Sequence, residues 1–149
     1  MATLTDEINA KSKEIFAESY SMSLGELISL YKDRELDIHP EFQRFFRWTN
    51  TQKTRLIESF LLNIPVPSIF VSQREDGVWD VVDGLQRLST IFQFVGIFED
   101  HNGNLLPPLT LEATDLLPSL ANKTYEGETG FTETEKRFLK RAKIDVVIH

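Results

Sequence analysis

The sequence has no cysteine and only three histidines, His39, His101 and His149. Without cysteine the chain can form no disulfide, no thiolate metal site and no cysteine nucleophile, which is typical of proteins of the reducing cytoplasm. The histidines are scattered and show no ligand spacing, so the sequence does not predict a histidine-built metal site. A functional site in this chain is therefore expected to use carboxylate, amide and guanidinium groups.

Long apolar runs are also missing. No stretch approaches the length of a membrane span, and the first seven residues, MATLTDE, lack the basic start and apolar centre of a signal peptide. We therefore expect a cytoplasmic protein with no membrane partner. The 149 residues, of which 41% are hydrophobic and 26% charged, suffice for one compact domain with a real core.

Positive charge is in the minority. The chain has 23 acidic and 16 basic residues, a net charge of −7, which argues against nonspecific wrapping of nucleic acid by the whole domain. Two segments are nevertheless basic: residues 43–55 carry four cations and no acid, and residues 136–143 carry five cations. Either they are solvated faces, which composition alone favours, or one of them holds a phosphate-bearing ligand.

Helix and strand signals alternate along the chain. Capping patterns at Ser23, Thr49 and Thr132 predict three helix starts, and a further helix is expected from just after Asp83 to about Phe98. Strands are expected at 36–38, 68–72, 78–82 and 143–148, with Asp76-Gly77 as a hairpin turn. The mixture predicts an α+β fold.

The expected organisation is an N-terminal arm at residues 1–20, followed by one domain at residues 21–149. Because the chain stops at the end of an expected strand, we expect it to be the N-terminal part of a longer protein.

The junction between strand and helix at residues 80–91, DVVDGLQRLSTI, has more polar groups than a turn needs. Gly84 would let the backbone approach a ligand, and the free N–H groups of the helix start would attract phosphate. Arg87, one turn in, could grip phosphate oxygens in a bidentate way, and Asp83 could hold Mg²⁺ or orient a water. The simpler interpretation is a capped helix with solvent-facing Gln86 and Arg87.

The context of this junction matches a known pattern. The elements are P-E-F-Q-R at 40–44, Trp48, Gln52, R-L-I-E-S at 55–59, I-P-V-P at 64–67 and D-G-L-Q-R-L-S-T at 83–90. In this order they resemble the N-terminal domain family of GmrSD-type, modification-dependent restriction proteins, and the resemblance covers about residues 23–98. The sequence departs from the family's D-G-Q-Q-R-L-T-T motif at Leu85 and at Ser89.

The resemblance implies a ParB/sulfiredoxin-like fold, a small mixed sheet with flanking helices, that binds a nucleoside triphosphate (ATP, GTP or CTP) with Mg²⁺. In some relatives the nucleotide is hydrolysed. It implies catalytic roles for Asp83 and Arg87, with Asp83 also as the metal ligand. The implied nucleotide-binding residues are Gln43, Arg44, Gly84, Gln86, Arg87, Ser89 and Thr90.

The resemblance further implies that DNA is a partner through the full-length protein, and that cutting belongs to a C-terminal nuclease domain in cis or in a partner subunit. This chain alone is not expected to cleave DNA. The alternative function is a non-catalytic DNA-sensing or protein-interaction module of ParB-like fold, whose junction would hold a backbone phosphate of DNA.

For several other residues the sequence predicts whether the side chain is buried or exposed. We expect Phe42, Phe45 and Trp48 in the core and Asp80 at the surface. Arg44 could meet either phosphate or an acidic neighbour. The cations Arg47, Lys53 and Arg55 fit a solvated face better than an edge that faces DNA.

Overall fold

The computed structural model describes residues 2–14, 18–39, 47–100 and 102–149. Its sheet has five strands in the order β1-β5-β3-β4-β2. The outer pair β1 (Glu18–Ser23) and β5 (Lys143–Ile148) is antiparallel, as is the central pair β3 (Ile69–Gln73) and β4 (Trp79–Asp83). The pairs β5–β3 and β4–β2 (Leu36–Asp37) are parallel. A mixed sheet with helices confirms the α+β class.

Three helices start where the capping patterns predict. Ser23 precedes α2 (Leu24–Lys32), and its hydroxyl accepts a hydrogen bond from the Glu26 amide at 3.1 Å. Complete capping boxes, in which the cap and the third helical residue bond to each other's backbone, begin α4 (Asn50–Leu61) and α6 (Glu133–Arg141). Local side-chain hydrogen bonding therefore defines these helix starts.

The predicted hairpin is also confirmed. The turn after β3 closes with the Gly77 amide donating to the Arg74 carbonyl at 3.0 Å, and Gly77 has a φ of 89°. This positive φ is the reason for glycine at the turn. The hairpin places β4 beside β3, so that β4 delivers the junction at Asp83 to the middle of the domain.

Two predictions of secondary structure were wrong. Residues 18–23 form the edge strand β1, which was not predicted, because its pairing partner β5 lies more than a hundred residues away in sequence. The helix after Asp83, α5 (Leu85–Phe94), ends four residues before Phe98. The chain turns out of the helix at Gly96, whose φ of 82° is typical of a helix C-terminus.

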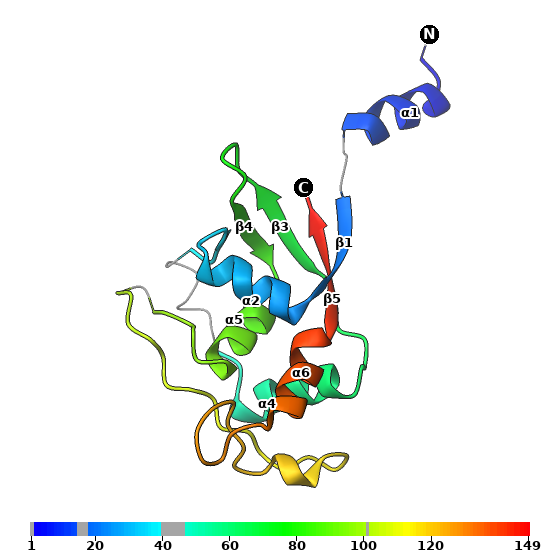
Figure 1. Ribbon diagram of the computed structural model, residues 1–149. Helices are drawn as coiled ribbons and strands as arrows, with labels where there is room; N and C mark the ends of the chain where they lie inside the picture. The colour runs from blue at the N-terminus through cyan, green and yellow to red at the C-terminus, as the bar shows by residue number, and fades with distance from the viewer. Residues whose placement is uncertain (1, 15–17, 40–46, 101) are drawn as a thin grey trace.

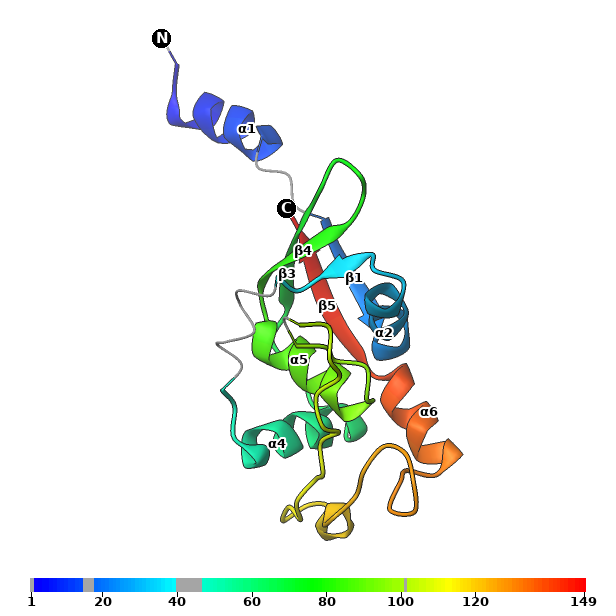
Figure 2. The same ribbon diagram turned by 90° about the vertical axis from the view of Figure 1, so that its left-hand side faces the viewer.

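Helices α2, α4, α5 and α6 gather around the sheet, whereas α1 (Leu4–Glu14) stands apart from this body (Figures 1 and 2). The apolar side of α5 is fully buried in the core, and the Phe92 ring stacks on Tyr31 with 4.3 Å between ring centroids. The expected core residue Trp48 packs against this core and is partly buried, whereas Phe42 and Phe45 lie outside the described residues. Because one whole face of α5 is buried, the core holds the helix, and with it the helix N-terminus, in one orientation.

The connection between α5 and α6 has one short 3₁₀ helix, η1 (Pro118–Leu120). Within the described ranges, no helix combines the length and apolar character that crossing a membrane requires.

Candidate functional site

Strand β4 passes into α5 through a single residue, Gly84. This glycine has φ 104° and ψ 17°, and among the described residues no side-chain cap is recorded for the helix that follows. The Asp83 carboxylate is exposed and accepts a hydrogen bond from the Gly84 amide at 2.9 Å. The first N–H groups of a helix have no intrahelical partner and carry partial positive charge. The junction therefore combines an uncapped helix start with an exposed carboxylate beside it.

Gly84 is required for steric as well as backbone reasons. A Cβ atom at this position would lie 3.3 Å from Cγ1 of Ile69, a fully buried residue of β3, and 3.4 Å from Nη2 of Arg87. The positive φ is itself unfavourable for any residue with a side chain. Glycine therefore allows strand, helix and guanidinium to meet closely here.

Arg87 packs beneath the helix start. Its Nη2 donates to the Ser68 carbonyl at 2.8 Å, at the residue that precedes β3. Its Nε is buried and has no hydrogen-bond partner in the part of the chain that the structure describes. Within the same residues, no carboxylate forms an ion pair with this guanidinium. A half-buried cation without an anion is an expensive arrangement, and an anionic ligand would relieve it.

Gln86 connects the helix start to the chain before α4. Its Oε1 accepts hydrogen bonds from the backbone amides of Arg47 at 3.1 Å and Trp48 at 3.3 Å. Residues 47–48 are thereby held at the N-terminus of α5. The predicted pocket residues Gln43 and Arg44 lie outside the described residues, four and three positions before Arg47 in the sequence.

Ser89 and Thr90 lie elsewhere. Both have 0% relative exposure, and the Thr90 hydroxyl donates to the Gln86 carbonyl at 2.7 Å, within the helix. Both lie on the buried side of α5, and their predicted contact with a nucleotide stays a prediction. Helical spacing was the sequence signal for Ser89, which lies four residues after Leu85 and three before Phe92, on the apolar side of the helix.

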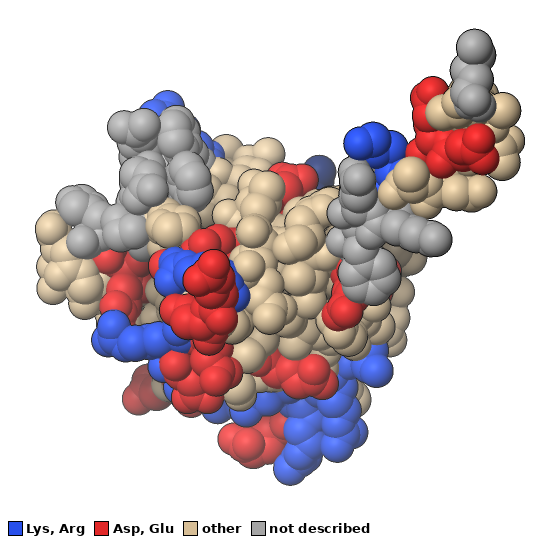
Figure 3. Space-filling view, turned by 90° about the horizontal axis from the view of Figure 1, so that it is seen from above, with Lys and Arg blue, Asp and Glu red and all other residues tan. Residues whose placement is uncertain are grey.

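The three cations at 47–55 have different environments. Lys53 donates to Gln93 Oε1 at 2.8 Å, and burial lowers the pKa of this ammonium group. Arg47 and Arg55 are both exposed, as predicted for a solvated face. Seen from above, acidic and basic side chains lie interspersed on the surface (Figure 3).

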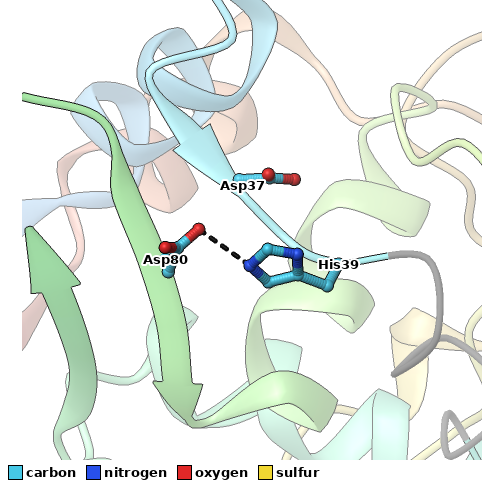
Figure 4. A group of neighbouring side chains, drawn as sticks. All are labelled: Asp37, His39 and Asp80. Carbon is cyan, nitrogen blue, oxygen red and sulfur yellow. Dashed lines mark hydrogen bonds and ion pairs between the residues drawn. The ribbon is translucent and has the colours of Figure 1, made fainter. Parts of the chain in front are cut away.

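A second polar group was not predicted from the sequence. Asp37 on β2, His39 just after it and Asp80 on β4 have one potential ligand atom each within 4.8 Å of one another (Figure 4). His39 Nε2 lies 2.8 Å from Asp80 Oδ1, and Arg74 Nη2 forms ion pairs with both carboxylates. Asp80, expected at the surface, has 26% of its side chain exposed, and its contacts with Arg74 and His39 were not predicted.

The electrostatics of this group follow from its contacts. Hydrogen bonds from Arg74, followed by that from His39, hold the pKa of the Asp80 carboxyl below its usual value, although burial opposes the shift. Hydrogen bonds to Asp80 and then Asp37 raise the pKa of Arg74. Asp37 and His39 alternate with the buried Leu36 and Ile38 and so share one face of the extended chain. This Asp-x-His pattern was the sequence signal that could have indicated the group.

The fold and the junction together define a mixed α+β domain in which a strand passes into a helix through a single glycine. The chain matches the family described as GmrSD restriction endonuclease, N-terminal domain, over residues 24–147, and it belongs to this family. The match confirms the family predicted from the spaced motifs, and places the chain among the domains of restriction proteins.

No curated protein and no solved structure matched the chain. The α+β class therefore rests on the structure, and the narrower ParB/sulfiredoxin-like assignment stays a prediction.

Proposed function

We propose that this domain binds the phosphates of a nucleoside triphosphate at the N-terminus of α5, as the nucleotide-responsive part of a restriction protein that acts on foreign DNA. The observation that carries the proposal is Arg87, a half-buried guanidinium with a buried Nε and no anionic partner among the described residues. Guanidinium groups bind phosphate oxygens strongly because several N–H donors point in one plane.

The backbone of the junction supports the same ligand. Gly84 lets Arg87 pack close to the helix start, and the amides at the beginning of α5 add the positive end of the helix dipole. Oxygens of a phosphate above Gly84 would meet these amides and the guanidinium together. Gln86 contributes by holding residues 47–48 at the helix start.

Asp83, the carboxylate at the junction among the described residues, is the proposed ligand of Mg²⁺. It is exposed, and one oxygen remains after Oδ1 accepts the Gly84 amide. Mg²⁺ in nucleotide sites commonly has one or two carboxylate ligands, with waters and phosphate oxygens for the rest. The site therefore needs no metal cage built by the protein alone. Gln43 and Arg44 remain proposed members of the pocket.

If the nucleotide is hydrolysed, a water attacks the γ-phosphorus and the bond to the β–γ bridging oxygen breaks, giving the diphosphate and inorganic phosphate. Arg87 would neutralise charge on the transferred group, and Asp83 would orient the metal or the water. In such transfers positioning and charge neutralisation supply most of the catalysis. DNA cutting is assigned to a separate nuclease domain, in cis or on a partner subunit.

The test is a titration of the purified chain with ATP, GTP and CTP, with and without Mg²⁺. Saturable binding should weaken at least about tenfold in Arg87→Ala, because a charge-assisted contact contributes about 1.5–3 kcal/mol. Asp83→Asn should remove the Mg²⁺ dependence. The matched control is Arg137→Ala on α6, an exposed arginine away from the junction, which should bind as the parent does.

Equal affinity in the parent and in a folded Arg87→Ala variant would contradict the nucleotide site. Circular dichroism separates this result from misfolding, because the substitution also removes the bond to the Ser68 carbonyl. DNA binding that needs no nucleotide and weakens steeply with salt would instead support the DNA-sensing module.

A further inference from the structure

Asp37 and Asp80 lie directly opposite one another in the sheet. In the parallel pairing of β2 with β4, Asp37 is the register partner of Asp80. Like charges at directly opposed positions destabilise a sheet unless a cation lies between them. Strand β2 is only two residues long and lies at the edge of the sheet, so this pair occupies half of its length. The fold therefore needs a positive charge at this point.

His39 adds a nitrogen donor to the same place. It lies two residues after Asp37. Leu36 and Ile38, which alternate with these two residues, are buried in the core, so Asp37 and His39 share the other face of the extended chain. Figure 4 shows the imidazole and the Asp80 carboxylate pointing toward one another, with Asp37 on the adjoining strand. Their ligand atoms lie within 4.8 Å of one another.

Arg74 supplies the positive charge in this structure. It reaches the two carboxylates from the turn between β3 and β4, through Nη2 to both and through Nε to Asp80. Two carboxylates and one guanidinium leave a charge of −1 when His39 is neutral. A divalent cation in place of the guanidinium would bring the charge to zero.

The guanidinium has room to leave. The Arg74 side chain is 35% exposed, and with Asp37 it borders a groove of about 620 Å³ that also includes Tyr31, Gly96 and Leu105. Its side chain is long and starts at a hairpin turn, so it can swing into the groove without moving either strand. The groove gives an ion access to the Asp37 carboxylate and leaves space for coordinated water, and 26% of the Asp80 side chain is exposed.

We propose that Asp37, His39 and Asp80 form a binding site for one divalent first-row transition metal ion such as Zn²⁺, which takes the place of Arg74. Two carboxylate oxygens and one imidazole nitrogen suit such an ion, whereas Mg²⁺ and Ca²⁺ prefer sites built of oxygen alone. Ligands around Zn²⁺ at about 2.0–2.2 Å lie about 3–4 Å apart, so modest side-chain rotations close the cluster. The ion would tie the edge strand β2 to β4.

This site is distinct from the proposed nucleotide site, and its test needs no nucleotide. The chain, freed of metal with a chelator, is titrated with Zn²⁺ by calorimetry and with Co²⁺ by visible absorption. We expect one ion per chain. His39→Ala should weaken binding at least about tenfold, as loss of a metal-supporting group typically does. His149→Ala is the matched control, because this exposed histidine belongs to no acidic cluster among the described residues.

The decisive variant is Arg74→Gln. Because the guanidinium and the metal ion compete for the same two carboxylates, this variant should bind Zn²⁺ about tenfold more tightly than the parent does. Folding of each variant is checked by circular dichroism. The proposal is overturned if Arg74→Gln binds Zn²⁺ no more tightly than the parent does. It is also overturned if His149→Ala lowers the affinity for Zn²⁺ as much as His39→Ala does. In either case the cluster is an ion-pair network only.

Discussion

Replacing Gly84 by alanine tests whether the junction depends on the absence of a side chain. The alanine would have to adopt a φ of 104°, and conformations of this left-handed kind cost about 1–2 kcal/mol. Its Cβ would also lie 3.3 Å from Ile69 Cγ1 in the closely packed core. Crowding at a buried contact adds about 1 kcal/mol. We expect Gly84→Ala to lower the free energy of unfolding by about 2–3 kcal/mol.

The control for this substitution is Gly77→Ala in the β3–β4 turn. Gly77 also has a positive φ, of 89°, but no described atom lies within 4 Å of the position that its Cβ would take. This variant should therefore show only the backbone cost, about 1–2 kcal/mol. The difference between the two variants reports the crowding of the added Cβ against Ile69 and Arg87.

The assay is urea unfolding followed by tryptophan fluorescence, since Trp48 and Trp79 both pack against the core. The midpoint should fall in both variants, and further in Gly84→Ala, without a change in the slope m. If the two glycine variants lose the same stability, the close approach of β3 to the junction has no energetic weight and the reasoning is refuted.

Three further outcomes are expected from the same unfolding assay. Thr132→Ala should cost about 1 kcal/mol, because it removes the side-chain cap of α6; Thr132→Ser, which keeps the hydroxyl, should restore most of it. Phe92→Ala should cost about 3–5 kcal/mol, since the ring is fully buried; a loss below 1 kcal/mol would contradict its place in the core. Because the pKa of Asp80 is lowered in the folded state, its stabilising effect is present above the ordinary pKa of Asp, about 4, and is lost as pH falls through the folded value. The stability difference between the parent and Asp80→Asn should therefore be constant at neutral pH and shrink in acid; a difference that grows in acid would reverse the assigned sign.

Features with local causes were predictable from the sequence. The capped starts of α2, α4 and α6 depend on hydrogen bonds between residues three apart, and the hairpin turn depends on Asp76-Gly77. The junction at Gly84 was found for the same reason, since its strand, glycine and helix are consecutive. Sequence motifs report such features because their physical cause lies within a few residues.

Features that depend on distant pairing were not predictable. Strand β1 has mostly exposed residues and exists because β5 pairs with it, and Asp37 meets Asp80 only because β2 and β4 lie side by side. The burial of Ser89 and Thr90 likewise depends on which side of α5 the rest of the domain covers.

The position of β5 in the sheet has a consequence for synthesis of the protein. This strand, the last along the chain, lies between β1 and β3 and is hydrogen-bonded to both. During translation β1 leaves the ribosome early but has no partner until residues 143–148 emerge, whereas the β3–β4 hairpin can form as soon as it is made. Until residues 143–148 have emerged, the nascent chain therefore holds an incomplete sheet, with the edge of β3 open to other unpaired strands. Completion of the sheet joins two strands that lie more than a hundred residues apart in the sequence.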